Sequence, residues 1–181
     1  MNRFSIISRA AIAATALSIS ALAPAATTSV INTRVHGALT RFYAAGSNHR
    51  ELARKASAVL VFPRVTKAGI GVGGEYGEGA LEVNGATVGY YKVTGASVGA
   101  TLGAGRHSEV ILFMTDEARE KFVNSKGWTI GADAGVAVVK GVGTEADSQT
   151  LQHPVLAFVF GEKGLIADVS LEGAKISKIE Q

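Results

Sequence analysis

Residues 68–105 have the sequence AGIGVGGEYGEGALEVNGATVGYYKVTGASVGATLGAG, in which glycine recurs between apolar residues. Gly69, Gly71 and Gly73 stand two apart, so in a strand they share one face that carries almost no side chains. Such glycines mark sharp curvature, bulges or the close approach of another backbone or ligand. The Asn-Gly pair at 84–85 favours the positive φ angles of a type I′ turn. The stretch therefore predicts a small, strongly curved sheet containing a hairpin.

Helices are expected before this sheet. Apolar residues recur at helical spacing between residues 29 and 45, which predicts an amphipathic helix with Arg34 and Arg41 on its other faces. Asn48 and Glu51 fit a capping box that opens a second short helix through about residue 56. The next apolar run, 58–62, suits either a buried strand or the last turn of this helix, and it stops at Pro63.

The second half of the chain alternates strands with one more helix. Thr115 is expected to cap a helix over residues 116–126. Strands are expected at 155–160, 165–169 and 175–179, joined by short turns that make them antiparallel neighbours. The predicted fold is α+β: N-terminal helices followed by a curved, glycine-rich antiparallel β-sheet, forming a barrel-like sandwich with one inserted helix. Residues 26–181 are expected to form a single domain.

The N-terminus has the pattern of a secretory signal peptide. Arg3 and Arg9 precede an uncharged run from 10 to 23, and small residues follow it. This run is shorter than the roughly 20 residues that span a bilayer. We expect residues 1–25 to be the signal peptide, with cleavage after Ala25 or Ala26. The product would be periplasmic or secreted, with peripheral membrane association as a further expectation, and the chain has no cysteine for disulfides or lipid attachment.

Positive charge is concentrated in one segment. Residues 30–67 contain seven basic side chains against the single carboxylate of Glu51, which points to an anionic partner. The alternative interpretation is a solvated helix face that orients against a more acidic body. Under the first interpretation, the candidate lipid- or anion-binding residues are Arg34, Arg41, Arg50, Arg54, Lys55, Arg64 and Lys67.

Enzyme and cofactor motifs occur only in the wrong context. Residues 69–74 satisfy G-x-G-x-x-G, but a polar, glycine-rich stretch follows where the dinucleotide fingerprint needs a helix. Ser97 lies in a G-x-S-x-G pattern and His153 follows it, yet no strand–turn–helix context accompanies them. The four histidines lack metal-ligand spacing. We therefore expect no enzyme activity, no cofactor and no metal, and a serine hydrolase at Ser97 is the remaining enzymatic alternative.

Several blocks taken together resemble the SYLF domain family. They are AVLVFP at 58–63, AGIGVGGEYGEGAL at 68–81, GYYKVTGASVG at 89–99, FMTDEAREKF at 113–122, KGL at 163–165 and SLEGAKISKI at 170–179. Eukaryotic members are similar to phosphoinositide-binding and actin-associated modules, and bacterial members look like exported lipid-binding proteins. The resemblance implies a binding module and not an enzyme.

The expected partner is an anionic lipid or membrane surface. An amphipathic helix beside a basic cluster offers an apolar face together with charges for lipid headgroups. Nucleic acid is not expected, and actin is not expected because a chain exported in this way looks bacterial. Whether the apolar helix face meets the membrane or the sheet stays open at this point. The alternative function is a structural or protein-interaction module of the envelope without a lipid ligand.

Overall fold

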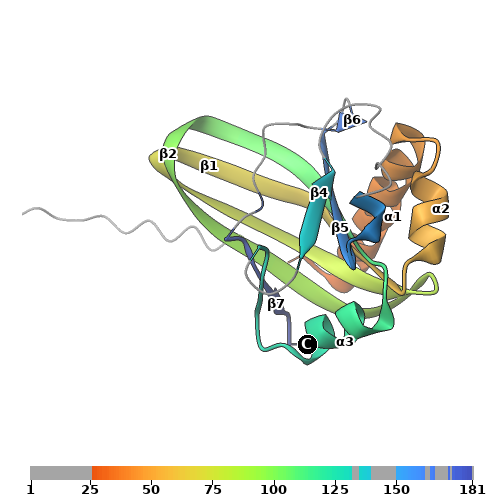
Figure 1. Ribbon diagram of the computed structural model, residues 1–181. Helices are drawn as coiled ribbons and strands as arrows, with labels where there is room; N and C mark the ends of the chain where they lie inside the picture. The colour runs from red at the N-terminus through yellow and green to blue at the C-terminus, as the bar shows by residue number, and fades with distance from the viewer. Residues whose placement is uncertain are drawn as a thin grey trace, which may run out of the picture.

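The computed structural model describes residues 26–131, 135–139, 150–161, 164, 165, 171 and 173–180. In the strand segments 70–72, 97–104 and 164–165 it describes the backbone alone. The elements are α1 (Thr28–Ala45), α2 (His49–Lys55), β1 (Ala58–Val83), β2 (Ala86–Phe113), α3 (Asp116–Asn124), β3 (Trp128–Thr129), β4 (Val136–Val139), the 3-10 turn η1 (Thr150–Gln152), β5 (Val155–Gly161), β6 (Gly164–Leu165) and β7 (Lys175–Lys178). The predicted α+β fold class is confirmed (Figure 1).

One long hairpin dominates the molecule. β1 and β2 pair antiparallel from Ala58–Phe113 to Val83–Ala86. The turn is at Asn84 and Gly85, with φ of 51° and 78°, as the sequence predicts. The apolar run at 58–62 is therefore the start of a strand, not the end of a helix. Pro63 does not end that strand: it falls where the register shifts between Phe62 and Val65, a place where a ladder hydrogen bond is already lost.

The hairpin curls until the two ends of β1 pass close to each other. A Cβ atom added at Gly77 would lie 2.9 Å from the carbonyl oxygen of Arg64, and one added at Gly79 would overlap the carbonyl oxygen of Val61. The ribbons in Figure 1 run away from the helices, bend at the left of the view and return. The predicted curvature is confirmed, and glycine permits the close approach of the backbones.

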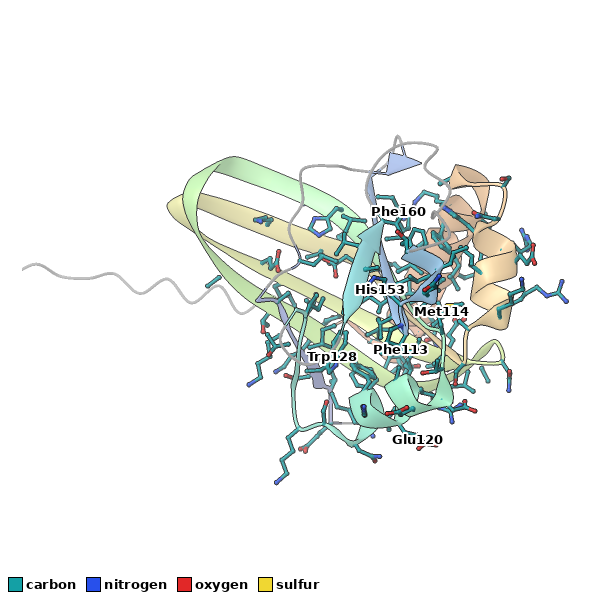
Figure 2. The ribbon with its side chains drawn as sticks, in the orientation of Figure 1. Phe113, Met114, Glu120, Trp128, His153 and Phe160 are labelled. Atoms are coloured by element: carbon teal, nitrogen blue, oxygen red, sulfur yellow. The ribbon has the colours of Figure 1, made fainter. Side chains whose placement is uncertain are left out.

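The sheet has two cores, one on each face. Alternate residues of β1 and β5 such as Val61 and Phe158 pack under α1 and α2, while Leu60 and Val159 point to the opposite side with α3 and Trp128. In Figure 2, Phe160 lies on the side of α1, and Phe113 and Trp128 lie beside α3. The chain therefore forms a curled sheet with α1 and α2 over part of one face and α3 over part of the other.

The sheet is not wholly antiparallel, which corrects the prediction. The described strands follow the order β3-β7-β2-β5-β4, with β1 on β2 and β6 on β5, and β4 runs parallel to β5. The expected ladder of three final strands is correct only for β5 and β6. In the described part of the chain β7 pairs instead with β2 and β3, because the curled sheet brings Thr94 and Tyr91 to it. Residues 166–170 of the expected middle strand lie outside the described residues.

The helices confirm the predicted periodicity. α1 buries Ile31, Val35, Ala38, Leu39 and Phe42 against the sheet. The open alternative about this helix is thus decided: its apolar face packs on the protein. The side chain of Asn48 does not cap α2, whereas Thr115 caps α3 by accepting a hydrogen bond from the backbone N–H of Ala118 at 3.2 Å.

Candidate anion-binding site

Three arginines converge where the N-terminal helix meets the hairpin. Arg41 comes from the C-terminal part of α1, Arg64 from the register shift in β1, and Arg106 from β2, where its backbone pairs with Thr66. They line a pocket of about 360 Å³, which we call the arginine pocket. Its lining residues are Arg41, Pro63, Arg64, Arg106, His107, Ser108 and Gly161.

A buried serine fixes the floor of the arginine pocket. The Ser108 hydroxyl donates to the carbonyl oxygen of Pro63 at 2.8 Å. Its oxygen accepts a long hydrogen bond from Nη2 of Arg41 at 3.4 Å. Ser108 is only 6% exposed, whereas the three arginines are exposed. The Arg41 guanidinium group is thus anchored to the fold through Ser108, and all three arginines are open to solvent.

The chemistry of this lining favours an anion with several oxygens. None of the described lining residues is acidic, so the guanidinium charges are not neutralised within the pocket. Planar guanidinium groups bind phosphate or carboxylate oxygens through paired N–H donors. A phosphate group offers enough oxygens to engage more than one arginine at once. The arginine pocket is therefore suited to a phosphate group.

A buried polar pair lies behind the arginine pocket. Nε2 of His107 is 2.8 Å from Oε1 of Glu109, and the two side chains are only 4% and 0% exposed. The second oxygen of Glu109 is buried and has no partner among the described atoms, and the same holds for one oxygen of Glu75. Burial raises the pKa of the Glu75 carboxyl group above its usual value, and the charge of Glu109 adds to this rise; Lys67 and His107 oppose it. The hairpin thus carries one partly buried carboxyl group, that of Glu75, whose ionisation is disfavoured.

The structure separates the seven predicted binding residues. Arg41 and Arg64 line the arginine pocket, and the other five do not. Arg50 stacks on the ring of Tyr43 at 4.5 Å, and Lys55 forms an exposed ion pair with Glu51 at 2.7 Å. Arg34 and Arg54 are exposed on α1 and α2, and Lys67 is half-buried in β1 near Glu75.

Sequence reasoning missed the three polar residues that β2 contributes to the pocket. Arg106, His107 and Ser108 lie outside the basic segment 30–67, so a search for clustered charge along the chain passes over them. The signal that could have found them is the Asn-Gly turn, which makes residues before position 84 face residues after position 85. When a basic residue lies in one strand of a predicted hairpin, the residues opposite it in the other strand should therefore be checked for further basic side chains.

The described residues do not show a catalytic arrangement for the serine hydrolase alternative at Ser97. The side chain of Ser97 lies outside the described residues, and His153 is exposed just before β5 (Figure 2). Within the described ranges, no three histidine, aspartate or glutamate side chains gather closely enough to hold a metal ion. Among those residues there is also no helix with the length and apolar character needed to cross a membrane.

Comparison with known families gives one match, in the second half of the chain. Residues 94–181 match the Ysc84 family, described as Las17-binding protein actin regulator. This C-terminal part of the chain is thus similar to the SYLF domain family. The resemblance drawn from the sequence blocks is confirmed. The SYLF match begins within β2 and covers Arg106 and Ser108, whereas Arg41 and Arg64 precede it. A comparison with curated proteins finds no match to this chain.

Proposed function

We propose that this protein is a non-enzymatic module that binds anionic membranes by holding a lipid phosphate group in the arginine pocket. The observation that carries the proposal is the convergence of Arg41, Arg64 and Arg106 around the buried hydroxyl of Ser108. These groups come from three separate elements. A solvated charge run along one helix does not produce such an arrangement.

Electrostatic attraction contributes several kcal/mol to the free energy of this binding. A basic side chain near an anionic membrane surface contributes about 1 kcal/mol. Three arginines together then contribute about 3 kcal/mol, and exposed Arg34, Arg50 and Arg54 add weaker long-range attraction. Because the arginines are exposed, dissolved salt screens the attraction. The proposed binding is therefore reversible and sensitive to ionic strength.

Contact with the lipid is peripheral in this proposal. The apolar residues of α1, including Val35 and Phe42, are buried in the core and are not available to enter the bilayer. The polar face of α1, which carries Arg41, faces the headgroups instead. This differs from the sequence-based idea in which an amphipathic helix supplies both apolar anchoring and charge.

The proposed location is the bacterial envelope. The signal-peptide pattern at residues 1–25 supports export to the periplasm or beyond. The family description names Las17 binding and actin regulation, and actin is not a partner that an exported bacterial protein would meet. Anionic phospholipid remains as the partner consistent with both the pocket and the location.

Co-sedimentation with vesicles tests the proposal. The mature protein is mixed with neutral phosphatidylcholine vesicles and with vesicles that also contain an anionic phospholipid, each with and without soluble inorganic phosphate. Binding only to anionic vesicles is the expected result. Binding of phosphate without vesicle binding would assign the pocket to a soluble anion. Absence of both would favour the second function, a structural or protein-interaction module of the envelope.

A further inference from the structure

The backbone nitrogen of Ala26, just after the signal-peptide pattern, is bound by a carboxylate of β1. The backbone nitrogen of Ala26 donates to Oε2 of Glu78 in β1 at 3.0 Å. Oε1 of Glu78 accepts the hydroxyl of Tyr76 at 2.7 Å, so both oxygens of this carboxylate are engaged. Ala26 also packs against the core under α1. Its nitrogen is therefore fixed in place.

This nitrogen lies at a junction that the sequence marks for cleavage. Ala23 and Ala25 form the small-residue A-x-A pattern that precedes the cut in secretory signal peptides. Cleavage after Ala25 would make Ala26 the first residue. The sequence alone leaves cleavage after Ala25 or Ala26 open, but only the first leaves the nitrogen beside Glu78 as a terminal amine.

We propose that removal of residues 1–25 turns the Ala26 nitrogen into an α-ammonium group that forms an ion pair with Glu78, so that Glu78 is the binding site for the mature N-terminus. The inference rests on the proposed export of the chain. Before cleavage, a neutral amide donates to the carboxylate. After cleavage, both partners are charged, so the attraction between opposite charges is added to a hydrogen bond that the carboxylate already strengthens.

The ion pair also solves an electrostatic problem at the start of α1. A positive terminus next to a helix N-terminus is unfavourable because that end of the helix already carries partial positive charge. The first turn of α1 contains no acidic residue, and Thr27 makes no side-chain capping hydrogen bond. Glu78 supplies the missing negative charge from another element. Processing thereby strengthens the attachment of α1, and of Arg41 within it, to the sheet.

The pairing has a defined dependence on pH. An α-amino group has an ordinary pKa of about 7.7–8.0, and a neighbouring carboxylate raises the pKa of the amine in the folded protein. As long as Glu78 is ionised, the stabilisation is therefore complete below about pH 8 and is lost as pH rises through the raised pKa of the amine.

The experiment uses the full-length precursor, exported and then purified from the envelope fraction. Intact mass should show a chain that begins at Ala26. A second precursor carries Gly-Ser inserted after Ala25, which moves the terminal charge away from Glu78 while it keeps the A-x-A pattern. At pH 7 the insertion should lower the denaturation midpoint by about 2–4 °C, the usual scale for a lost charged interaction in a domain of this size. At pH 10.5 the difference should vanish.

The Glu78→Gln variant is the matched control. In this background the insertion should have no effect or a slightly stabilising one, since it removes an uncompensated positive charge from the start of α1. NMR titration of the α-amino group in the unsubstituted protein gives the raised pKa without any variant. A terminus at another residue, an ordinary α-amino pKa, or an equal loss in both backgrounds would overturn the inference.

Vesicle binding separates this inference from the proposed function. Neither the insertion nor Glu78→Gln changes a residue of the arginine pocket, so both should bind anionic vesicles as the unmodified protein does. If the Ala26–Glu78 ion pair is observed but the protein does not bind anionic vesicles, only the lipid-binding proposal is refuted. If the protein binds anionic vesicles but the Ala26–Glu78 ion pair is not observed, only the ion-pair inference is refuted.

Discussion

Gly79 lies directly against the carbonyl oxygen of Val61, although both residues belong to the same strand. A side chain at position 79 would occupy the space of that oxygen and of the Phe62 ring. The contact exists because β1 curls back over its own beginning. Arg64 follows this contact in β1, is exposed and lines the arginine pocket.

Replacing Gly79 with alanine should destabilise the fold strongly. The added Cβ would meet backbone, which cannot rotate away as a side chain can, and overpacking of this kind costs about 1–3 kcal/mol or more. Urea unfolding measures the loss. Gly74→Ala is the matched control, because its Cβ would be 3.7 Å from the nearest atom, the carbonyl oxygen of Gly95. Equal stability of the two variants would mean that the ends of β1 do not meet. The side-chain surroundings of Gly71, which the sequence places on a face with almost no side chains, lie outside the described residues.

Loss of Arg106 should weaken binding to anionic vesicles. Arg106→Gln removes one guanidinium group from the arginine pocket, and about 1 kcal/mol corresponds to roughly a 5-fold loss of affinity. Arg54→Gln removes the same charge from an exposed site on α2 outside the pocket and should have a smaller effect. Binding should also fall as sodium chloride is raised. If both variants lose the same affinity, binding depends on the overall positive charge and not on the arginine pocket. If the protein binds neutral and anionic vesicles equally well, the electrostatic mechanism is wrong.

Glu75 should make stability fall as pH rises. The folded protein holds the Glu75 proton to a higher pH than the unfolded chain does, because burial and Glu109 raise its pKa. Between the ordinary and the raised pKa the folded state therefore binds more protons, so its stability decreases with rising pH. Glu75→Gln should be more stable than the parent at pH 7.5 and should lose this part of the pH dependence in urea titrations.

Glu51→Gln is the control for this titration. The hydrogen bond and charge of Lys55 lower the pKa of Glu51, so its small contribution has the opposite sign and is lost as pH falls. This pair is exposed and should change stability little. A Glu75→Gln variant that is less stable than the parent at neutral pH would show that the carboxylate has a favourable partner in the folded protein.

Ser97→Ala should leave folding and vesicle binding intact. Its G-x-S-x-G pattern lies within the long strand β2 and has no helix after it, so the nucleophile elbow is missing. A fluorophosphonate probe should not label the protein. Stoichiometric labelling at Ser97 that His153→Ala abolishes would instead establish a serine hydrolase.

The sequence by itself determined the features that depend on neighbouring residues. The hairpin turn follows from the tolerance of Asn84 and Gly85 for positive φ, and the buried face of α1 follows from helical spacing. Thr115 caps α3 through an atom three residues away from its partner. Each of these rests on local backbone geometry, which a short stretch of sequence encodes.

Only the tertiary structure decided which distant residues meet. Without register shifts, pairing outward from Val83 and Ala86 would place Thr66 opposite Gly103, but the shifts place it opposite Arg106. In the same curled fold, Arg41 of α1 reaches Ser108 of β2. There β7 pairs with β2, whereas the sequence predicted that it would pair with the strand before it. A shift of one residue exchanges the two faces of a strand, and the bulges that cause it depend on packing of the whole sheet. The basic segment was visible in the sequence, but the pocket is a product of the fold.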